Sequence, residues 1–269
     1  MYEFEEVIKK FKKIQKMGYV RGMYQNKLNA GGLTLEYLFG KEVDNKYTPD
    51  YKGIELKTKA RFSHYPYTLF TLPFNGPRKH EALDIASKYG RSSYGNSSYF
   101  INTQLILNEL VLVNGKFYFE LRCDKEKFYI NIYDNEMMFI ESRGYIKYSS
   151  IIKRANIKLK KIAFIRFSQK KKNYGYDFRY YQLICAKLID AKLIIKMLKN
   201  KQMILELNLK YHKIAGKYKN SCKNLIFNLP QENLNLLFDI VAKFEDKANK
   251  WLFDIFLCVT IVLVITCYT

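Results

Sequence analysis

The chain has 269 residues, of which 48% are apolar and 16% aromatic, so it is not an intrinsically disordered protein. This length allows one large domain or two lobes. Lys and Arg outnumber Asp and Glu by 46 to 25, which gives a formal net charge of +21. That charge predicts a polyanionic partner, either nucleic acid or an anionic membrane surface. Since a strongly A+T-biased genome also produces lysine-rich proteins, the charge is weaker evidence than its size suggests.

The five cysteines are widely spaced, with no Cys-x-x-Cys pair, and no secretory signal is visible at the N-terminus. We therefore expect free thiols in a cytoplasmic protein. The three histidines are isolated, which argues against a zinc cluster. No Ser-His or thiol hydrolase constellation is visible either.

In the first part of the chain, apolar periodicity and turn residues predict helices and strands. Expected are a helix over 3–17, a basic loop, a short helix over 31–40, a hairpin turn leading into a strand near 54–59, and a strand over 67–72. Glu36 lies off the apolar stripe of the short helix, so its default role is that of a solvated residue.

The second part of the chain alternates between strands and helices. Expected are a loop over 91–98, an antiparallel meander over 104–113, 116–123 and 127–133, strands over 159–167, 203–209 and 224–229, and helices over 188–199 and 231–244. Two basic segments with interleaved tyrosines, 169–176 and 210–223, either contact phosphates and stack on bases or form a solvated face.

The stretch PDYKGIELK, residues 49–57, is the most informative part of the sequence. Its Tyr-Lys-Gly segment is typical of a tight turn, and the residues after it alternate as in a strand. The apolar residues of that strand then face a core, while Glu55 and Lys57 project side by side and Asp50 reaches them across the turn. Carboxylate oxygens can hold Mg²⁺, and an ammonium group can orient a water or stabilise a phosphate oxyanion. An acid-x-Lys pair alone is more often a solvated surface pair.

Three segments in this order, MGYVRGMYQNKLNAGGLTLEYLFG, PDYKGIELKTKAR and YTLFTLPF, resemble the MvaI/BcnI restriction endonucleases. This family is related to MutH and Sau3AI within the PD-(D/E)xK nuclease superfamily. The resemblance is clear over 17–75 and looser over 76–245. It implies an α/β fold with a mixed α+β sheet, a restriction-endonuclease-like PD-(D/E)xK core and two lobes that flank a DNA cleft. The expected division is a catalytic lobe over 1–125, a DNA-recognition lobe over 126–248 and an apolar tail over 249–269.

Carried over position by position, the resemblance implies that Asp50 and Glu55 bind Mg²⁺ and that Lys57 positions the attacking water. Glu36 would join the metal site directly or through an intervening group. The expected DNA contacts are Arg21, Lys59, Arg61, Lys170, Lys171, Lys172, His212, Lys217 and Lys219.

The implied function is that of a type II restriction endonuclease, which hydrolyses phosphodiester bonds of double-stranded DNA with Mg²⁺. We expect a monomer, with any cognate DNA methyltransferase acting separately. The sequence departs from the family near 219–228, where a histidine and an arginine used for base reading are missing. This departure leaves open the recognition sequence and whether the segment preserves activity, and it does not touch the metal site.

Three alternatives remain open: a MutH-like strand-specific nickase, a DNA-binding protein with a decayed nuclease site, and a membrane-anchored basic protein. The apolar run of the tail, 255–267, is short for a membrane span, which needs about 20 residues. We expect an accessory or artefactual tail and no membrane partner.

Overall fold

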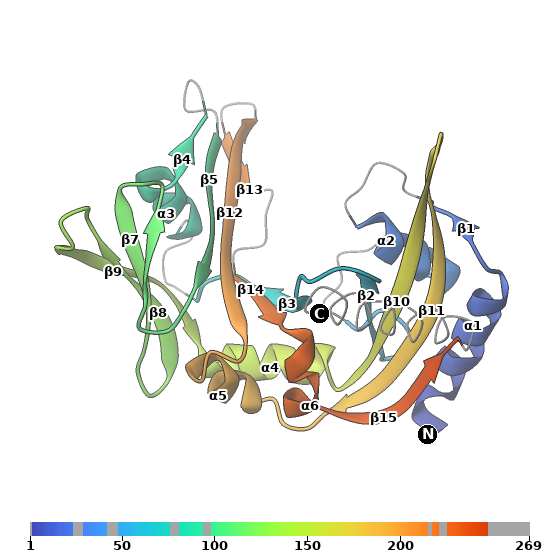
Figure 1. The fold of residues 1–269 in the computed structure, drawn as a ribbon. Helices are drawn as coiled ribbons and strands as arrows, with labels where there is room; N and C mark the ends of the chain where they lie inside the picture. Colours follow the sequence, from blue (N-terminus) through green and yellow to red (C-terminus); the bar gives the residue numbers. More distant parts are fainter. Residues whose placement is uncertain are drawn as a thin grey trace, which may run out of the picture. The chain divides into compact units, whose positions relative to one another are not determined.

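The computed structural model describes residues 2–23, 29–41, 48–75, 81–93, 98–214, 217–220 and 225–246. Its contacts group these residues into two compact units, whose elements are labelled in Figure 1. The first unit combines residues up to Ser63 with Lys161–Lys187 and the described residues from Ile240 onward, and the second combines His64–Lys160 with Leu188–Asp239. The lobe boundary expected after residue 125 falls inside the second unit, because the strands on either side of it pair with each other.

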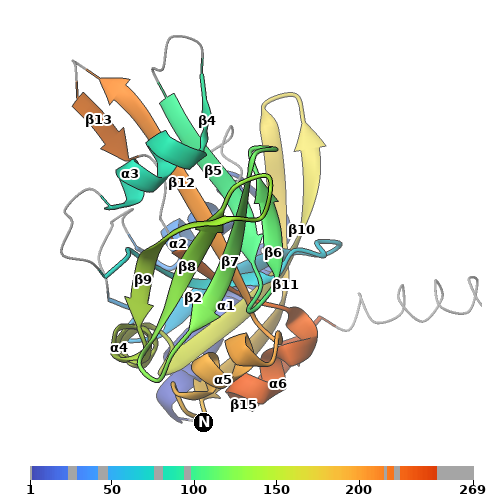
Figure 2. The same cartoon turned by 90° about the vertical axis from the view of Figure 1, so that its left-hand side faces the viewer.

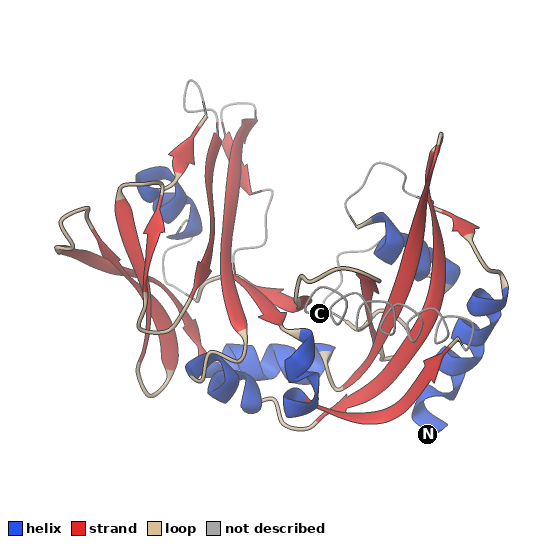
Figure 3. Cartoon of the chain, viewed as in Figure 1, coloured by secondary structure: helices blue, strands red, loops and turns tan. Residues whose placement is uncertain are grey.

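The first unit is built on a five-stranded mixed sheet. Its strands run in the order β1 (Val20–Arg21), β11 (Gly175–Leu188), β10 (Lys161–Lys172) and β2 (Glu55–Ala60), with β15 (Phe238–Glu245) also paired to β11. β10 and β11 form a long antiparallel hairpin, drawn as two long strands in Figure 3. β2 adds to β10 in parallel, with Glu55 opposite Ile162. β2 therefore ends the sheet as an edge strand.

Two helices share one apolar core with this sheet. A 3₁₀ turn (Tyr2–Phe4) leads into α1 (Glu5–Lys16), and α2 (Ala30–Leu38) follows. The buried stripe confirms the helix predicted over 3–17, and it comprises Phe4, Val7, Ile8, Phe11 and Ile14. α2 approaches the sheet closely, since a Cβ at Gly31 would lie 2.5 Å from the ring of Phe167. The buried hydroxyl of Tyr180 donates to the Gly31 carbonyl at 2.6 Å, which fixes the helix on the sheet.

The second unit contains two sheets, and most of their strands are labelled in Figure 2. The larger sheet has the order β3 (Tyr67–Leu72), β14 (Leu225–Leu229), β12 (Ile204–Ile214), β5 (Ser98–Leu105) and β4 (Arg91–Ser92), with β13 (Lys217–Asn220) paired to β12. The smaller sheet is the meander β6 (Leu110–Val113), β7 (Phe117–Cys123), β8 (Lys127–Tyr133) and β9 (Phe139–Lys147). The helices are α3 (Glu81–Tyr89), α4 (Tyr148–Lys158), α5 (Leu193–Lys199) and α6 (Leu234–Leu237), with a 3₁₀ turn at Gln231–Asn233.

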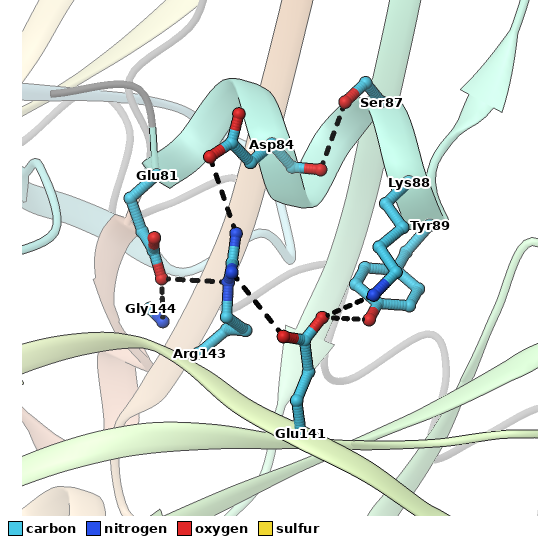
Figure 4. A network of polar contacts seen from close by, with 8 residues as sticks. All are labelled: Glu81, Asp84, Ser87, Lys88, Tyr89, Glu141, Arg143 and Gly144. Carbon is cyan, nitrogen blue, oxygen red and sulfur yellow. Dashed lines mark hydrogen bonds and ion pairs between the residues drawn. The ribbon is translucent and has the colours of Figure 1, made fainter. Parts of the chain in front are cut away.

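A polar network fastens α3 to β9 (Figure 4). The Arg143 guanidinium lies 3.2 Å from a carboxylate oxygen of Glu81 and 3.6 Å from one of Asp84, both on α3. On the same strand, Glu141 accepts hydrogen bonds from Lys88 and Tyr89. Burial is the largest single effect on the Glu141 carboxyl and raises its pKa. The hydrogen bonds from Tyr89 and Lys88 act in the opposite direction, and the net effect is a pKa below the usual range. The network positions the helix that packs behind β5 and β12.

Several predicted elements differ from the structure, among them the first strand of the meander, which was expected over 104–113 and is confined to β6. The basic segment 169–176, which was not predicted to be a strand, is the tip of the β10–β11 hairpin, because pairing continues to Lys172 opposite Gly175. The helix expected over 188–199 begins only at Leu193. The helix expected over 231–244 is a short helical segment followed by β15, whose pairing with β11 replaces helical hydrogen bonds.

Among the helices of the described ranges, none has the length and apolar composition of a membrane span. The apolar tail over 249–269 lies outside those ranges. Of the cysteines, Cys123 and Cys185 are described, and both are free thiols.

Candidate active site

The turn before β2 reverses the chain in two residues. Lys52 and Gly53 both have positive φ, 45° and 78°, as a type I′ hairpin turn requires. Tyr51 and Ile54 close the turn with reciprocal backbone hydrogen bonds of 2.9 and 2.8 Å. The turn chemistry read from the sequence is confirmed, and it brings Asp50 back alongside the start of β2.

Asp50 is held against the backbone of β2. Its Oδ2 accepts a hydrogen bond of 2.9 Å from the Leu56 N–H, and its side chain is only 8% exposed. Among the described strands, β2 lies at the edge of its sheet, and this carboxylate satisfies a backbone donor of that edge strand. One carboxylate oxygen is thereby fixed by the fold, and Oδ1 is engaged by the ammonium group of Lys41.

Glu55 and Lys57 form an ion pair on one face of β2. The Lys57 Nζ lies 2.9 Å from the Glu55 Oε1, and the two side chains are 20% and 3% exposed, respectively. Ile54 and Leu56 belong to the apolar core, as the alternation predicted. A solvated surface pair is therefore the wrong description of this motif. A carboxylate with so little solvent requires a positive partner, either the ammonium group or a cation.

Glu36 joins this group from α2. Burial, and next the negative charge of Asp50, raise the pKa of its carboxyl above the usual range, while Lys41 and Lys57 act in the opposite direction. Glu55 is a further carboxylate that acts on it. The Glu36 side chain is 25% exposed and its Oε2 lies 3.8 Å from the Lys41 Nζ, so Glu36 is a half-buried neighbour of the motif and not a fully solvated helix residue.

Lys41 is the residue that the sequence analysis missed. Its Nζ contacts Asp50 and lies 3.8 Å from the Glu36 Oε2, with the side chain 14% exposed. The signal that could have found it is its place directly after the helix stop at Gly40, a few residues before the motif. Only the fold shows that this lysine turns toward the carboxylates.

Within the described ranges, no three His, Cys, Asp or Glu side chains converge closely enough to form a metal-binding group. The donor chemistry nevertheless fits a hard divalent cation, because Asp50 and Glu55 are carboxylates of low exposure and Glu36 lies near both. Lysine ammonium groups now neutralise these oxygens.

The sequence profile of the MvaI/BcnI restriction endonuclease family matches residues 8–238. The chain belongs to the MvaI/BcnI restriction endonuclease family. The resemblance read from the three segments is thus confirmed, and the chain is grouped with site-specific DNA endonucleases. No curated protein sequence matches it.

Two solved structures are similar in fold. One is the complex of the restriction endonuclease MvaI with its cognate DNA substrate, at 20% sequence identity and a TM-score of 0.78, covering 89% of this chain and 98% of that chain. The other is MvaI in the absence of DNA, at 16% identity and a TM-score of 0.55, covering 91% and 98%, respectively. They confirm the restriction-endonuclease-like α/β fold.

In this family member, the predicted DNA contacts of the first unit fall into two groups. Lys59 is buried, at 7% exposure, and the Arg61 guanidinium lies 5.6 Å from the ring centre of Tyr181. By contrast, Lys170, Lys171 and Lys172 are exposed at the end of β10. The second group is therefore the better placed to meet a ligand in solution.

Cation–π contacts brace this hairpin end. The Arg21 guanidinium lies 4.4 Å from the ring centre of Tyr174, whose hydroxyl donates to Asp177 at 2.9 Å. Lys170 lies 4.4 Å from the ring centre of Tyr19. Arg21 and Lys170 therefore both belong to this basic and aromatic hairpin end, although more than a hundred residues separate them in sequence.

The remaining DNA-contact candidates lie in the second unit. The His212 Nδ1 is 2.7 Å from the Ser98 Oγ on the neighbouring strand. Only the backbone of Lys217 and Lys219 is described, on β13, and residues 221–224 of the departing segment lie outside the described ranges.

Proposed function

We propose that this family member is a Mg²⁺-dependent type II restriction endonuclease, a monomer that cuts both strands of DNA at a specific site. The observation that carries this proposal is the gathering of Asp50, Glu55 and Lys57 at the edge of one sheet, with Glu36 beside them. A decayed nuclease site would be expected to have lost a member of this set. A cognate DNA methyltransferase would act separately.

In the proposed reaction, a water oxygen attacks the phosphorus atom in line with the departing 3′-oxygen, which leaves a 5′-phosphate and a 3′-hydroxyl. Asp50 and Glu55 would hold Mg²⁺, which supplies Lewis-acid stabilisation of the phosphate and a more acidic water. The Lys57 ammonium orients the attacking water and stabilises the negative charge that develops on the phosphate oxygens. Glu36 supports the site through its interaction with Asp50.

DNA would be bound in part by the β10–β11 hairpin end. Its exposed lysines supply positive charge for phosphate contacts, and Tyr174 and Tyr19 hold Arg21 and Lys170 in place. Because such contacts neutralise phosphates without reading bases, they would support affinity more than specificity.

Sequence reading is proposed for the second unit, in line with a separate recognition lobe. One face of its larger sheet is polar, because register pairs Asn102 with Asn208 and Gln104 with Glu206. Asn228 donates to Glu206 at 3.0 Å on the same face. Asparagine and glutamine amides can form bidentate hydrogen bonds with adenine, and glutamate can accept from cytosine.

Replacing the exposed Asn102 and Gln104 together by alanine is expected to weaken discrimination between target and random DNA by about tenfold. Affinity for random DNA should stay within about twofold, because no phosphate-binding cation is removed. Competition binding with target and random duplexes measures both quantities. Equal losses on the two duplexes would contradict a base-reading role for this face.

A cleavage assay on supercoiled plasmid distinguishes the proposed activity from the alternatives. A restriction endonuclease converts the plasmid to linear DNA cut at fixed positions, and sequencing of the ends gives the target. A strand-specific nickase yields only the relaxed circle, and a decayed enzyme leaves the plasmid unchanged. A cleavage rate that stays proportional to the enzyme concentration as the enzyme is diluted would support a monomer.

A further inference from the structure

Backbone hydrogen bonds at the C-terminal end of α2 fix the position of Lys41. Gly40 has φ +78°, its N–H donates to the Tyr37 carbonyl at 2.8 Å, and the Lys41 N–H donates to the Glu36 carbonyl at 2.9 Å. This pair of bonds is the Schellman arrangement of a helix C-terminus. The same helix end therefore carries Glu36 and aims the side chain of Lys41 back toward it.

The ammonium group of Lys41 lies between two acidic side chains that come from different elements. It contacts Asp50, at the turn before β2, and it lies 3.8 Å from Glu36, on α2. The contacted Oδ1 is the oxygen of Asp50 that the Leu56 N–H does not use. Carboxylates this close repel one another unless a cation or a proton intervenes.

We propose that Lys41 is an internal counter-cation of the candidate metal site: it holds Asp50 and Glu36 together while no divalent cation is bound, and it competes with that cation for the same oxygens. This inference rests on the proposed function, because it takes Asp50 as a metal ligand. A lysine suits this role, since its charge is compact and its stem has four rotatable carbons, so the ammonium can leave while the backbone stays fixed. Lys41 thereby tunes how much divalent cation the enzyme requires.

Two consequences follow for a chain that lacks this charge. Without a divalent cation, the carboxylates of Glu36, Asp50 and Glu55 then have one ammonium group fewer to compensate their charge, so the free protein loses stability. With a divalent cation, no ammonium group has to be displaced, so the cation binds more tightly. A residue that only filled space would change neither quantity in this pattern.

The test uses Lys41→Met in the full chain without DNA, so no cleavage is involved. Lys52→Met is the matched control, because Lys52 lies in the adjacent turn and its partner Glu6 is 60% exposed. Calorimetric titration with Mn²⁺ gives the dissociation constant, and thermal unfolding in EDTA and in saturating Mn²⁺ gives the melting temperatures. We expect Lys41→Met to bind Mn²⁺ about tenfold more tightly and to melt about 3 °C lower in EDTA, a loss that Mn²⁺ removes.

Lys41→Arg serves as the second variant, since it keeps the charge. It is expected to bind Mn²⁺ as weakly as the wild type and to melt normally in EDTA. Unchanged or weaker Mn²⁺ binding by Lys41→Met, or binding by Lys41→Arg as tight as that of the Met variant, would overturn the proposal. If the wild type cuts DNA and Lys41→Met has wild-type affinity for Mn²⁺, this inference alone fails. If the expected affinities are found but no DNA is cut, the proposed function fails instead.

Discussion

Replacing Asp50 by asparagine is expected to lower the rate of DNA cleavage at least about 1,000-fold while leaving DNA binding intact. Asparagine keeps the shape and one acceptor oxygen, so the hydrogen bond from the Leu56 N–H can persist and the turn should stay folded. The negative charge that would hold Mg²⁺ is lost. Single-turnover cleavage and a binding titration on the same duplex measure the two effects separately.

Asp239→Asn is a suitable control for this variant, because Asp239 is an exposed aspartate on β15. It should cut DNA at the wild-type rate. Cleavage by Asp50→Asn within about tenfold of the wild-type rate would remove Asp50 from the proposed metal site.

Replacing Lys57 by methionine is expected to reduce the cleavage rate about 100-fold or more. Unlike Asp50→Asn, this variant keeps both proposed metal ligands and should gain more stability from a bound cation. Methionine matches the length of the stem but leaves the Glu55 carboxylate, only 3% exposed, without its ammonium partner. The variant should therefore be less stable in EDTA and should gain more in melting temperature from Mn²⁺ than the wild type gains. The melting temperature with and without Mn²⁺, together with the cleavage rate, tests both parts.

Lys9→Met controls for loss of positive charge, because Lys9 is 66% exposed on α1 and pairs with Glu5, which is itself 50% exposed. It should leave both quantities unchanged. If the Lys57→Met enzyme had normal stability and a nearly normal cleavage rate, the ion pair with Glu55 would contribute to neither stability nor catalysis. The proposed role of Lys57 in catalysis would then be wrong.

The predictions that the structure confirms depend on short-range sequence patterns. The turn before β2 needs positive φ at two consecutive residues, and Lys52-Gly53 supplies them within a short window of sequence. The helix over 3–17 was predictable because its buried side recurs at helical spacing. Alternation in β2 likewise separated Glu55 and Lys57 from the core residues beside them.

Non-local pairing explains what the sequence could not predict. β2 is completed by β10, more than a hundred residues later, and it is that parallel pairing which leaves β2 as the edge strand. The segment that became β15 has the apolar spacing of a short helix, but pairing with β11 decides its conformation. The burial of Glu36 and the approach of Lys41 to Asp50 depend on α2 meeting the turn. Neither contact leaves a periodic signal in the sequence.

We propose a metal-dependent, site-specific nuclease whose chemistry depends on Asp50. The most direct measurement is incubation of the full chain and its Asp50→Asn variant with phage DNA, each with Mg²⁺ and with EDTA. Discrete fragments are expected only from the wild type with Mg²⁺. Fragments from Asp50→Asn, or from the wild type in EDTA, would contradict the proposal, as would intact phage DNA under all conditions.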